Sequence, residues 1–243
     1  ARYVAAIIPQ LIAASIGFVV YFSVLGRTFL GIYQIPPYEF EIADMATAAG
    51  LGVLAAAVMA TLVGVVIVVR RLAVLVGNAY AFALLGGAAV GVISMALPLT
   101  LGAGQSQLET VIEDISTLSA GLLIAVLVAK MVAVALSLSV GFLGGNVFPM
   151  IFIGGTAGVV VHLLIPEIPF ALAVSCMLAA VPGSYLRAPI SMTFIAVVAV
   201  ALDARTAAPV AVAVLTSYLL VGTVRYLLGI RRQRTPEAET LEA

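Results

Sequence analysis

A glycine-rich segment between two apolar runs, residues 141–155, reads GFLGGNVFPMIFIGG and decides how the chain is interpreted. Its paired residues Gly144 and Gly145 let the backbone turn tightly and approach a ligand closely. Pro149 has the fixed φ that suits the first turn of a helix, where its missing N–H costs nothing. An uncharged apolar run follows, from Met150 to Leu164. The pattern predicts a glycine-rich loop that opens a helix starting inside a membrane.

The start of such a helix carries unpaired backbone N–H groups and the positive end of a dipole. In hydrocarbon these groups need a partner, unless they line a cavity. An anion is one natural partner. The local pattern fits equally a re-entrant turn whose N–H groups are satisfied by neighbouring helices, and it does not separate the two interpretations.

Composition places the whole chain in a membrane. Of its 243 residues, 64% are hydrophobic and only 9% are charged, whereas soluble domains carry about 25% charged residues. The mean hydropathy is +1.26. We therefore predict an all-α polytopic membrane protein, placed in the cell membrane of a prokaryote. The formal net charge of zero gives no reason to expect a nucleic-acid partner.

Motifs for enzymatic chemistry are absent from the sequence. There is no Walker loop, dinucleotide fingerprint or serine–histidine–acid set, and the single cysteine, Cys176, rules out an intrachain disulfide or a cysteine metal cluster. We expect no enzyme, no cofactor and no metal site.

The apolar runs are unequal in length. Those long enough to span a bilayer of about 30 Å are Tyr3–Gly26, Met45–Val69 (ended by Arg70 and Arg71), Tyr80–Leu97, Leu118–Leu138 and Ala207–Val224. Shorter segments are Leu108–Ser116, Phe170–Val181 (closed by Pro182 and Gly183) and Pro189–Leu202. Broken helices of this kind are typical of transporters that bind a solute near the midplane.

The basic residues suggest an orientation and a domain division. Arg2, the pair 70–71 and the cluster that begins at Arg231 are expected on the cytoplasmic side, with Arg27 outside. Residues 1–230 then form a transmembrane domain, and residues 231–243 form a polar cytoplasmic tail. Because the chain does not begin with Met, we expect it to be the later part of a longer protein.

Two motifs resemble the CLC family of chloride channels and chloride/proton antiporters. The sequence GGNVFP at 144–149 resembles the GGxFxP motif of that family, and LRAPI at 186–190 resembles its RAP(L/I) turn. Lys130, in the segment before the glycine loop, also has a counterpart there. The resemblance implies the C-terminal portion of the fold: one helix of the first repeat, the whole inverted second repeat with its broken and re-entrant helices, and a remnant of the last helix.

The resemblance also implies a site. In the family, backbone amides at the start of the helix after the glycine loop coordinate the anion; by position, these are the N–H groups of Asn146 and Val147. Gly144, Gly145, Phe148 and Pro149 complete the expected site loop. Fixed backbone dipoles suit a halide that must also leave, because a full positive charge would hold it too tightly.

A homodimer with one anion path in each subunit is the assembly that the resemblance implies. Its interface would use Tyr3–Gly26, Pro189–Leu202 and Ala207–Val224. The N-terminal half of the same protein is a second expected partner, because the family's GSGIP and G(K/R)EGP motifs, the latter with its gating glutamate, are absent here.

Other departures affect the site itself. Val147 stands where the family has Phe, and Phe148 lies next to the proline. The pore tyrosine of the family cannot be placed; Tyr226 is the nearest candidate, and Tyr218 lies before that point.

We therefore predict transmembrane transport of an anion, with chloride as the default ion, by a channel or an anion/proton antiporter. The alternatives are a secondary transporter of another solute and a non-conducting membrane subunit. For Lys130, a role in transport is weighed against a structural one, in which the side chain snorkels to an interface or caps helix carbonyls. Gly154 and Gly158 have the spacing that permits close helix packing within the subunit.

Overall fold

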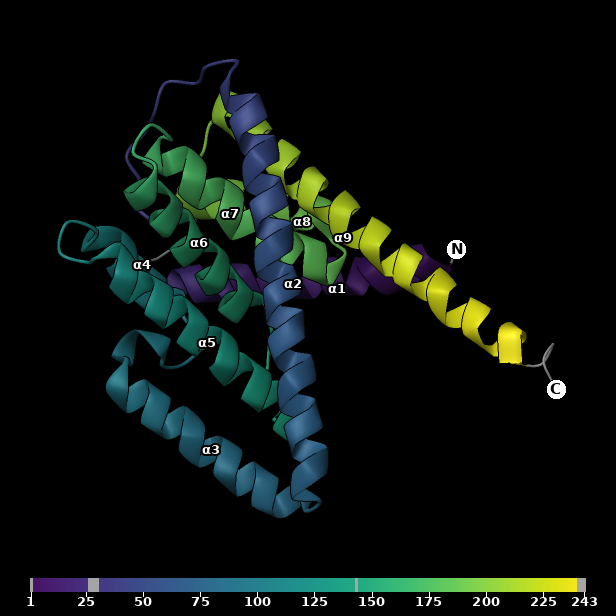
Figure 1. Cartoon of the computed structure of the whole chain (residues 1–243). Coiled ribbons are helices and arrows are strands. Elements are labelled where there is room, and N and C mark those ends of the chain that lie inside the picture. The colour runs from purple at the N-terminus through teal and green to yellow at the C-terminus, as the bar shows by residue number, and fades with distance from the viewer. Residues whose placement is uncertain (1, 26–30, 143, 240–243) are drawn as a thin grey trace.

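The computed structural model describes residues 2–25, 31–142 and 144–239. In these ranges the chain is helical and has no strand (Figure 1), which confirms the predicted all-α class. Six of the helices are long and apolar enough to cross a membrane. The elements are α1 (Arg2–Leu25), α2 (Asp44–Val76), α3 (Ala79–Ala96), the 3-10 turn η1 (Pro98–Thr100), α4 (Gln105–Glu113), α5 (Ala120–Val140), α6 (Val147–Leu164), α7 (Phe170–Leu186), α8 (Pro189–Val200) and α9 (Ala204–Glu239).

Helices α6 and α7 form the centre of the fold. Helix α6 packs against α4, α5 and α7, while α7 also contacts α2, α8 and α9. A Cβ atom at Gly154 would collide with the carbonyl oxygen of Met177, and one at Gly158 would collide with that of Ala173. The close packing predicted from the Gly154–Gly158 spacing is therefore confirmed, with α7 as the neighbour.

Outside this centre the helices are more exposed. Helix α3 lies against α5, on the side of the molecule where α2 ends (Figure 1). The membrane-length window of α1 has none of its residues buried. The segment that follows α1 is attached to α8, because the N–H groups of Gly31 and Tyr33 donate to the carbonyls of Val198 and Ala199 at 2.9 and 3.0 Å. Gly26 and Arg27, and with them the predicted outside position of Arg27, lie outside the described residues.

Several predicted helix ends are wrong, those of α2 and α7 among them. Helix α2 does not end at Arg70 and Arg71 but continues to Val76, and it stops at Gly77, whose φ of 68° is left-handed. Arginine is a good helix former, and both side chains are exposed. Helix α7 likewise does not close at Pro182 but runs to Leu186. Proline in a helix interior costs about 3 kcal/mol, and the continuous burial of 171–184 offsets that cost.

The last helix is longer than the predicted run Ala207–Val224. Helix α9 begins at Ala204 and continues to Glu239, so the chain is still helical where the polar tail was expected to begin at Arg231. Its uncharged apolar run ends at Val224, before Arg225. The division into a membrane domain and a cytoplasmic tail stays a prediction. The tail's last residues, 240–243, and Leu143 of the glycine loop lie outside the described residues.

Candidate functional site

The glycine loop begins where α5 ends. Gly141 has a φ of 85°, a conformation that glycine adopts without strain, and its N–H donates to the carbonyl of Ser137. The N–H of Phe142 donates to the same carbonyl at 3.0 Å. Gly144 and Gly145 are exposed, and no atom lies within 4 Å of the position that a Cβ would take at either residue. In the described chain these two glycines leave open space beside the loop.

Helix α6 starts at Val147, and its backbone donors are open. The first intrahelical bond runs from the N–H of Met150 to the carbonyl of Asn146 at 3.3 Å. Among the described residues, none accepts a hydrogen bond from the N–H of Asn146, Val147 or Phe148. The Asn146 side chain makes no capping bond, and Pro149 has no N–H to offer. The dipole of α6 thus presents its positive end without a protein partner.

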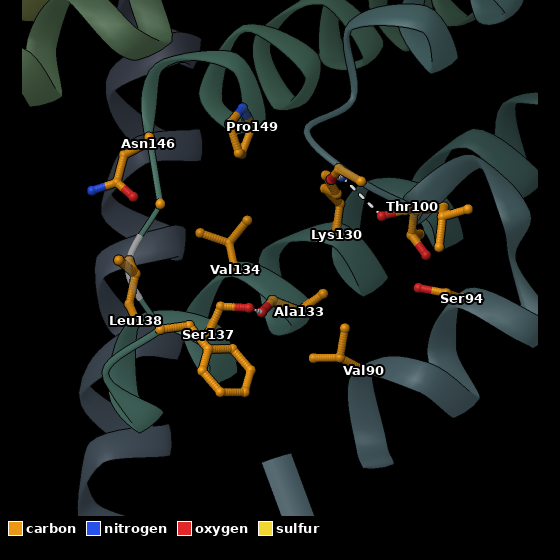
Figure 2. A pocket seen from close by; sticks show the side chains of 15 residues that line it. Val90, Ser94, Thr100, Lys130, Ala133, Val134, Ser137, Leu138, Asn146 and Pro149 are labelled. Carbon is orange, nitrogen blue, oxygen red and sulfur yellow. Dashed lines mark hydrogen bonds between the residues drawn. The ribbon is translucent and has the colours of Figure 1, made fainter. Parts of the chain in front are cut away.

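A cavity of about 310 Å³ lies between α3, α5 and this loop (Figure 2). Gly144, Gly145, Asn146 and Pro149 line it, whereas Val147 and Phe148 do not. The other polar side chains of the lining are Ser94, Thr100, Lys130 and Ser137. Among the described residues that line it there is no carboxylate, and Lys130 is the one charged side chain.

Lys130 supplies that charge from the middle of α5. Its side chain is 2% exposed, and its Nζ donates to the carbonyls of Thr100 and Gly102 at 2.8 and 2.7 Å. The ammonium also lies 5.1 Å from the ring centre of Phe152 in α6. The predicted capping of carbonyls is confirmed, although the carbonyls belong to η1 and the turn after it. The alternative that Lys130 snorkels to an interface is wrong, because the ammonium is buried.

Among the described residues, the groups that contact the Lys130 ammonium are uncharged. In the described ranges, no carboxylate forms an ion pair with Lys130, so its amino group is stabilised by two carbonyl dipoles and the face of the Phe152 ring. Figure 2 shows Lys130 and Thr100 on one side of the cavity and Asn146, the residue before α6, on the other.

Some residues that line the cavity are far apart in the sequence, and the sequence analysis did not connect them. Ser94 and Thr100 come from α3 and η1, far from the glycine loop in sequence, and the contact with Lys130 spans 28 to 30 positions. The only sequence signal was the cost of a charge within an apolar span, which made Lys130 conspicuous.

The two tyrosines considered as pore ligands do not reach this cavity. Tyr226 is 70% exposed, and Tyr218 lines a different pocket, with Arg187 and Arg225. Within the described chain, the site therefore consists of the glycine loop, the start of α6 and the Lys130 wall.

Comparison with known proteins identifies the family of the chain. The family model described as "Voltage gated chloride channel" matches residues 3–222. The chain belongs to this family. It also resembles proteins named "Putative ion-transport protein YfeO", with 33% identity over 93 residues to those of Salmonella newport and Salmonella agona and 32% to that of Salmonella schwarzengrund. Each match covers 38% of this chain and only 22% of the relative.

The family and the six apolar helices together place the chain in a membrane that it crosses several times. The bacterial relatives are consistent with a prokaryotic plasma membrane.

Proposed function

We propose that the full-length protein transports a small anion, chloride by default, and that the backbone N–H groups of Asn146 and Val147 hold the anion during transit. The observation that carries the proposal is the open start of α6: no described residue accepts a hydrogen bond from the N–H of Asn146 or Val147. Asn146 lines a cavity in which Lys130 is the only charged residue among the described lining residues. Gly144 and Gly145 leave room for the ion to approach the backbone.

Lys130 and the backbone amides would have different roles in transport. The Lys130 ammonium already donates to two carbonyls, so it raises the local potential while the amides make the direct contact. Amide dipoles bind a halide more weakly than a free ammonium would, which allows release on the other side.

The test is anion efflux from liposomes that contain the full-length protein. We expect chloride to leave loaded vesicles once valinomycin and potassium relieve the build-up of charge. No efflux above that of empty vesicles would remove the proposal and favour a non-conducting subunit. If amino acids or sugars, but not halides, shifted the thermal unfolding of the protein, a transporter of another solute would replace it.

A second arm of the same assay separates a channel from an antiporter. An outward chloride gradient that drives protons into the vesicles against their own gradient indicates exchange. Chloride efflux without proton movement indicates passive conduction.

For assembly, we propose a homodimer through α1, α8 and α9. These helices expose large apolar side chains, among them Ile190, Phe194 and Leu219 at 71, 67 and 63%. Phe194→Glu is expected to shift the dimer to monomer in detergent, measured by light scattering. A dimer that survives charged substitutions on all three helices contradicts the proposal.

A further inference from the structure

A second polar pocket lies away from the glycine loop, where the C-terminal end of α7 meets α9. Its volume is about 220 Å³, and Ser184, Arg187, Tyr218, Gly222 and Arg225 line it. Two guanidinium side chains and two hydroxyls thus converge, and no carboxylate is part of the lining. Across the described ranges, neither arginine forms an ion pair.

The backbone at Arg187 is unusual. Its φ is 55°, in the left-handed region that favours glycine, and it caps the C-terminal end of α7. Such backbone conformations persist only where the surroundings hold them, and they cluster at functional sites. Arg225 approaches from α9, where it is half-buried.

An apolar groove continues from this pocket. It lies between α2 and α9, has a volume of about 520 Å³ and shares Arg225 with the polar pocket. Small residues of α2 form its floor, and the α9 wall is aliphatic; its members besides Arg225 are Val53, Ala56, Ala57, Met59, Ala60, Val63, Gly64, Ile67, Leu220, Val221 and Val224. A cationic pocket and a long apolar groove therefore form one continuous surface.

The depth of this surface in the membrane matches its chemistry. The uncharged apolar run of α9, residues 207–224, ends immediately before Arg225, so we place this arginine near the level where hydrocarbon gives way to head groups. The groove residues from Val53 to Ile67 lie within the apolar window of α2. Arginine pairs with phosphate through two parallel hydrogen bonds.

We propose that this surface binds one anionic phospholipid, with its phosphate between Arg187 and Arg225 and an acyl chain in the α2–α9 groove. A soluble anion would leave the groove empty. A neighbouring protein helix would fill the groove, but it would also have to bring an anionic group to the two guanidiniums, because a buried unpaired charge is costly. The anionic lipid satisfies both parts of the surface at once.

The test is native mass spectrometry of the whole chain in detergent, titrated with phosphatidylglycerol or with phosphatidylcholine carrying identical acyl chains. We expect phosphatidylglycerol to bind tighter by roughly tenfold or more. The double variant Arg187→Gln/Arg225→Gln should bind both lipids equally. Arg205→Gln, an exposed arginine at the other end of α9, is the matched control and should keep the preference.

The groove is tested separately at Gly64, where no protein atom lies within 4 Å of an added Cβ. Gly64→Leu should fill the groove and weaken both lipids at least about threefold, whereas Gly50→Leu, in equally open space on the same helix, should not. Thermal unfolding of each variant shows that it is folded.

Three results would overturn the proposal. Equal binding of the two lipids by the parent chain removes the role of charge. If Gly64→Leu has no effect while glycerol phosphate displaces the lipid, the pocket holds a soluble anion instead. If Gly64→Leu dissociates the dimer and leaves lipid binding unchanged, the groove belongs to a second copy of the chain.

Discussion

Two helices of this protein begin at asparagine, and they begin differently. Asn78 precedes α3 with an extended backbone, and its side-chain oxygen accepts the N–H groups of Tyr80 and Ala81 at 2.9 and 3.1 Å. Asn146 precedes α6 with φ −88° and ψ −11°, and its side chain makes no capping bond. Asparagine is among the best N-capping residues when its backbone is extended. An asparagine before a helix is therefore not sufficient for capping. The backbone conformation of Asn146 leaves the first N–H groups of α6 without a side-chain cap.

The largest effect is expected at Lys130, which lies across the cavity from Asn146. Lys130→Met removes two charge-assisted hydrogen bonds and leaves the carbonyls of Thr100 and Gly102 without their donor. We expect a loss of about 1–3 kcal/mol in the free energy of unfolding for each carbonyl left unpaired, measured by denaturant titration in detergent. Lys130→Arg keeps the charge and should lose less. A methionine variant within about 0.5 kcal/mol of the parent would show that the ammonium is not needed to hold η1.

The open start of α6 is tested by removing one N–H and nothing else. Asn146→Pro deletes that donor, and the preceding Gly145 tolerates a following proline. Losing a hydrogen bond to an ion costs about 1.5–3 kcal/mol, so we expect halide affinity to fall about tenfold or more in calorimetric titration. Asn146→Ala keeps the N–H and is the control. Equal affinity in the proline variant and the parent would place the anion elsewhere.

The two asparagines are compared directly by alanine substitution. Asn78→Ala removes a cap that two N–H groups use and should cost about 1 kcal/mol of stability. Asn146→Ala should stay within about 0.5 kcal/mol, because its side chain caps nothing. Both variants are measured in the same unfolding experiment. Similar losses at the two positions would mean that Asn146 caps α6 after all.

The smallest effect is expected at the start of α9. In contrast to α6, this helix start is capped by a charged side chain, that of Asp203. The Asp203 carboxylate accepts from the hydroxyl of Thr206 and from its N–H, the latter at 2.8 Å. These bonds lower the pKa of Asp203, so its stabilising effect is present above the unfolded pKa of about 3.9 and is lost as pH falls through the lower folded value.

Asp203→Asn should therefore reduce the melting temperature slightly at pH 7, and the difference should shrink as the pH approaches 3. Thermal unfolding in detergent across this range measures it. A difference that does not change with pH would assign the effect to shape rather than to charge.

Much of the fold could be predicted from the sequence because it depends on local patterns. Uninterrupted apolar length predicted α1, α3 and α5 to within about two residues, and the glycine–proline spacing predicted that a helix opens near Pro149. The helix ends at Arg70 and Pro182 were predicted wrongly. Arginine does not stop a helix, so α2 continues past Arg70 although its last turns are exposed. At Pro182 the local cost of about 3 kcal/mol is exceeded by the burial of α7.

The sequence by itself thus determined the class of the protein, its family and the position of the helix start after the glycine loop, since all three depend on residues close together in the chain. Only the tertiary structure decided what surrounds that start. The reach of Lys130 to carbonyls 28 and 30 residues away, and the convergence of Arg187 and Arg225, depend on how helices cross. Helix crossing is set by packing between distant side chains, such as that of Gly154 and Gly158 against α7, and no short stretch of sequence encodes it.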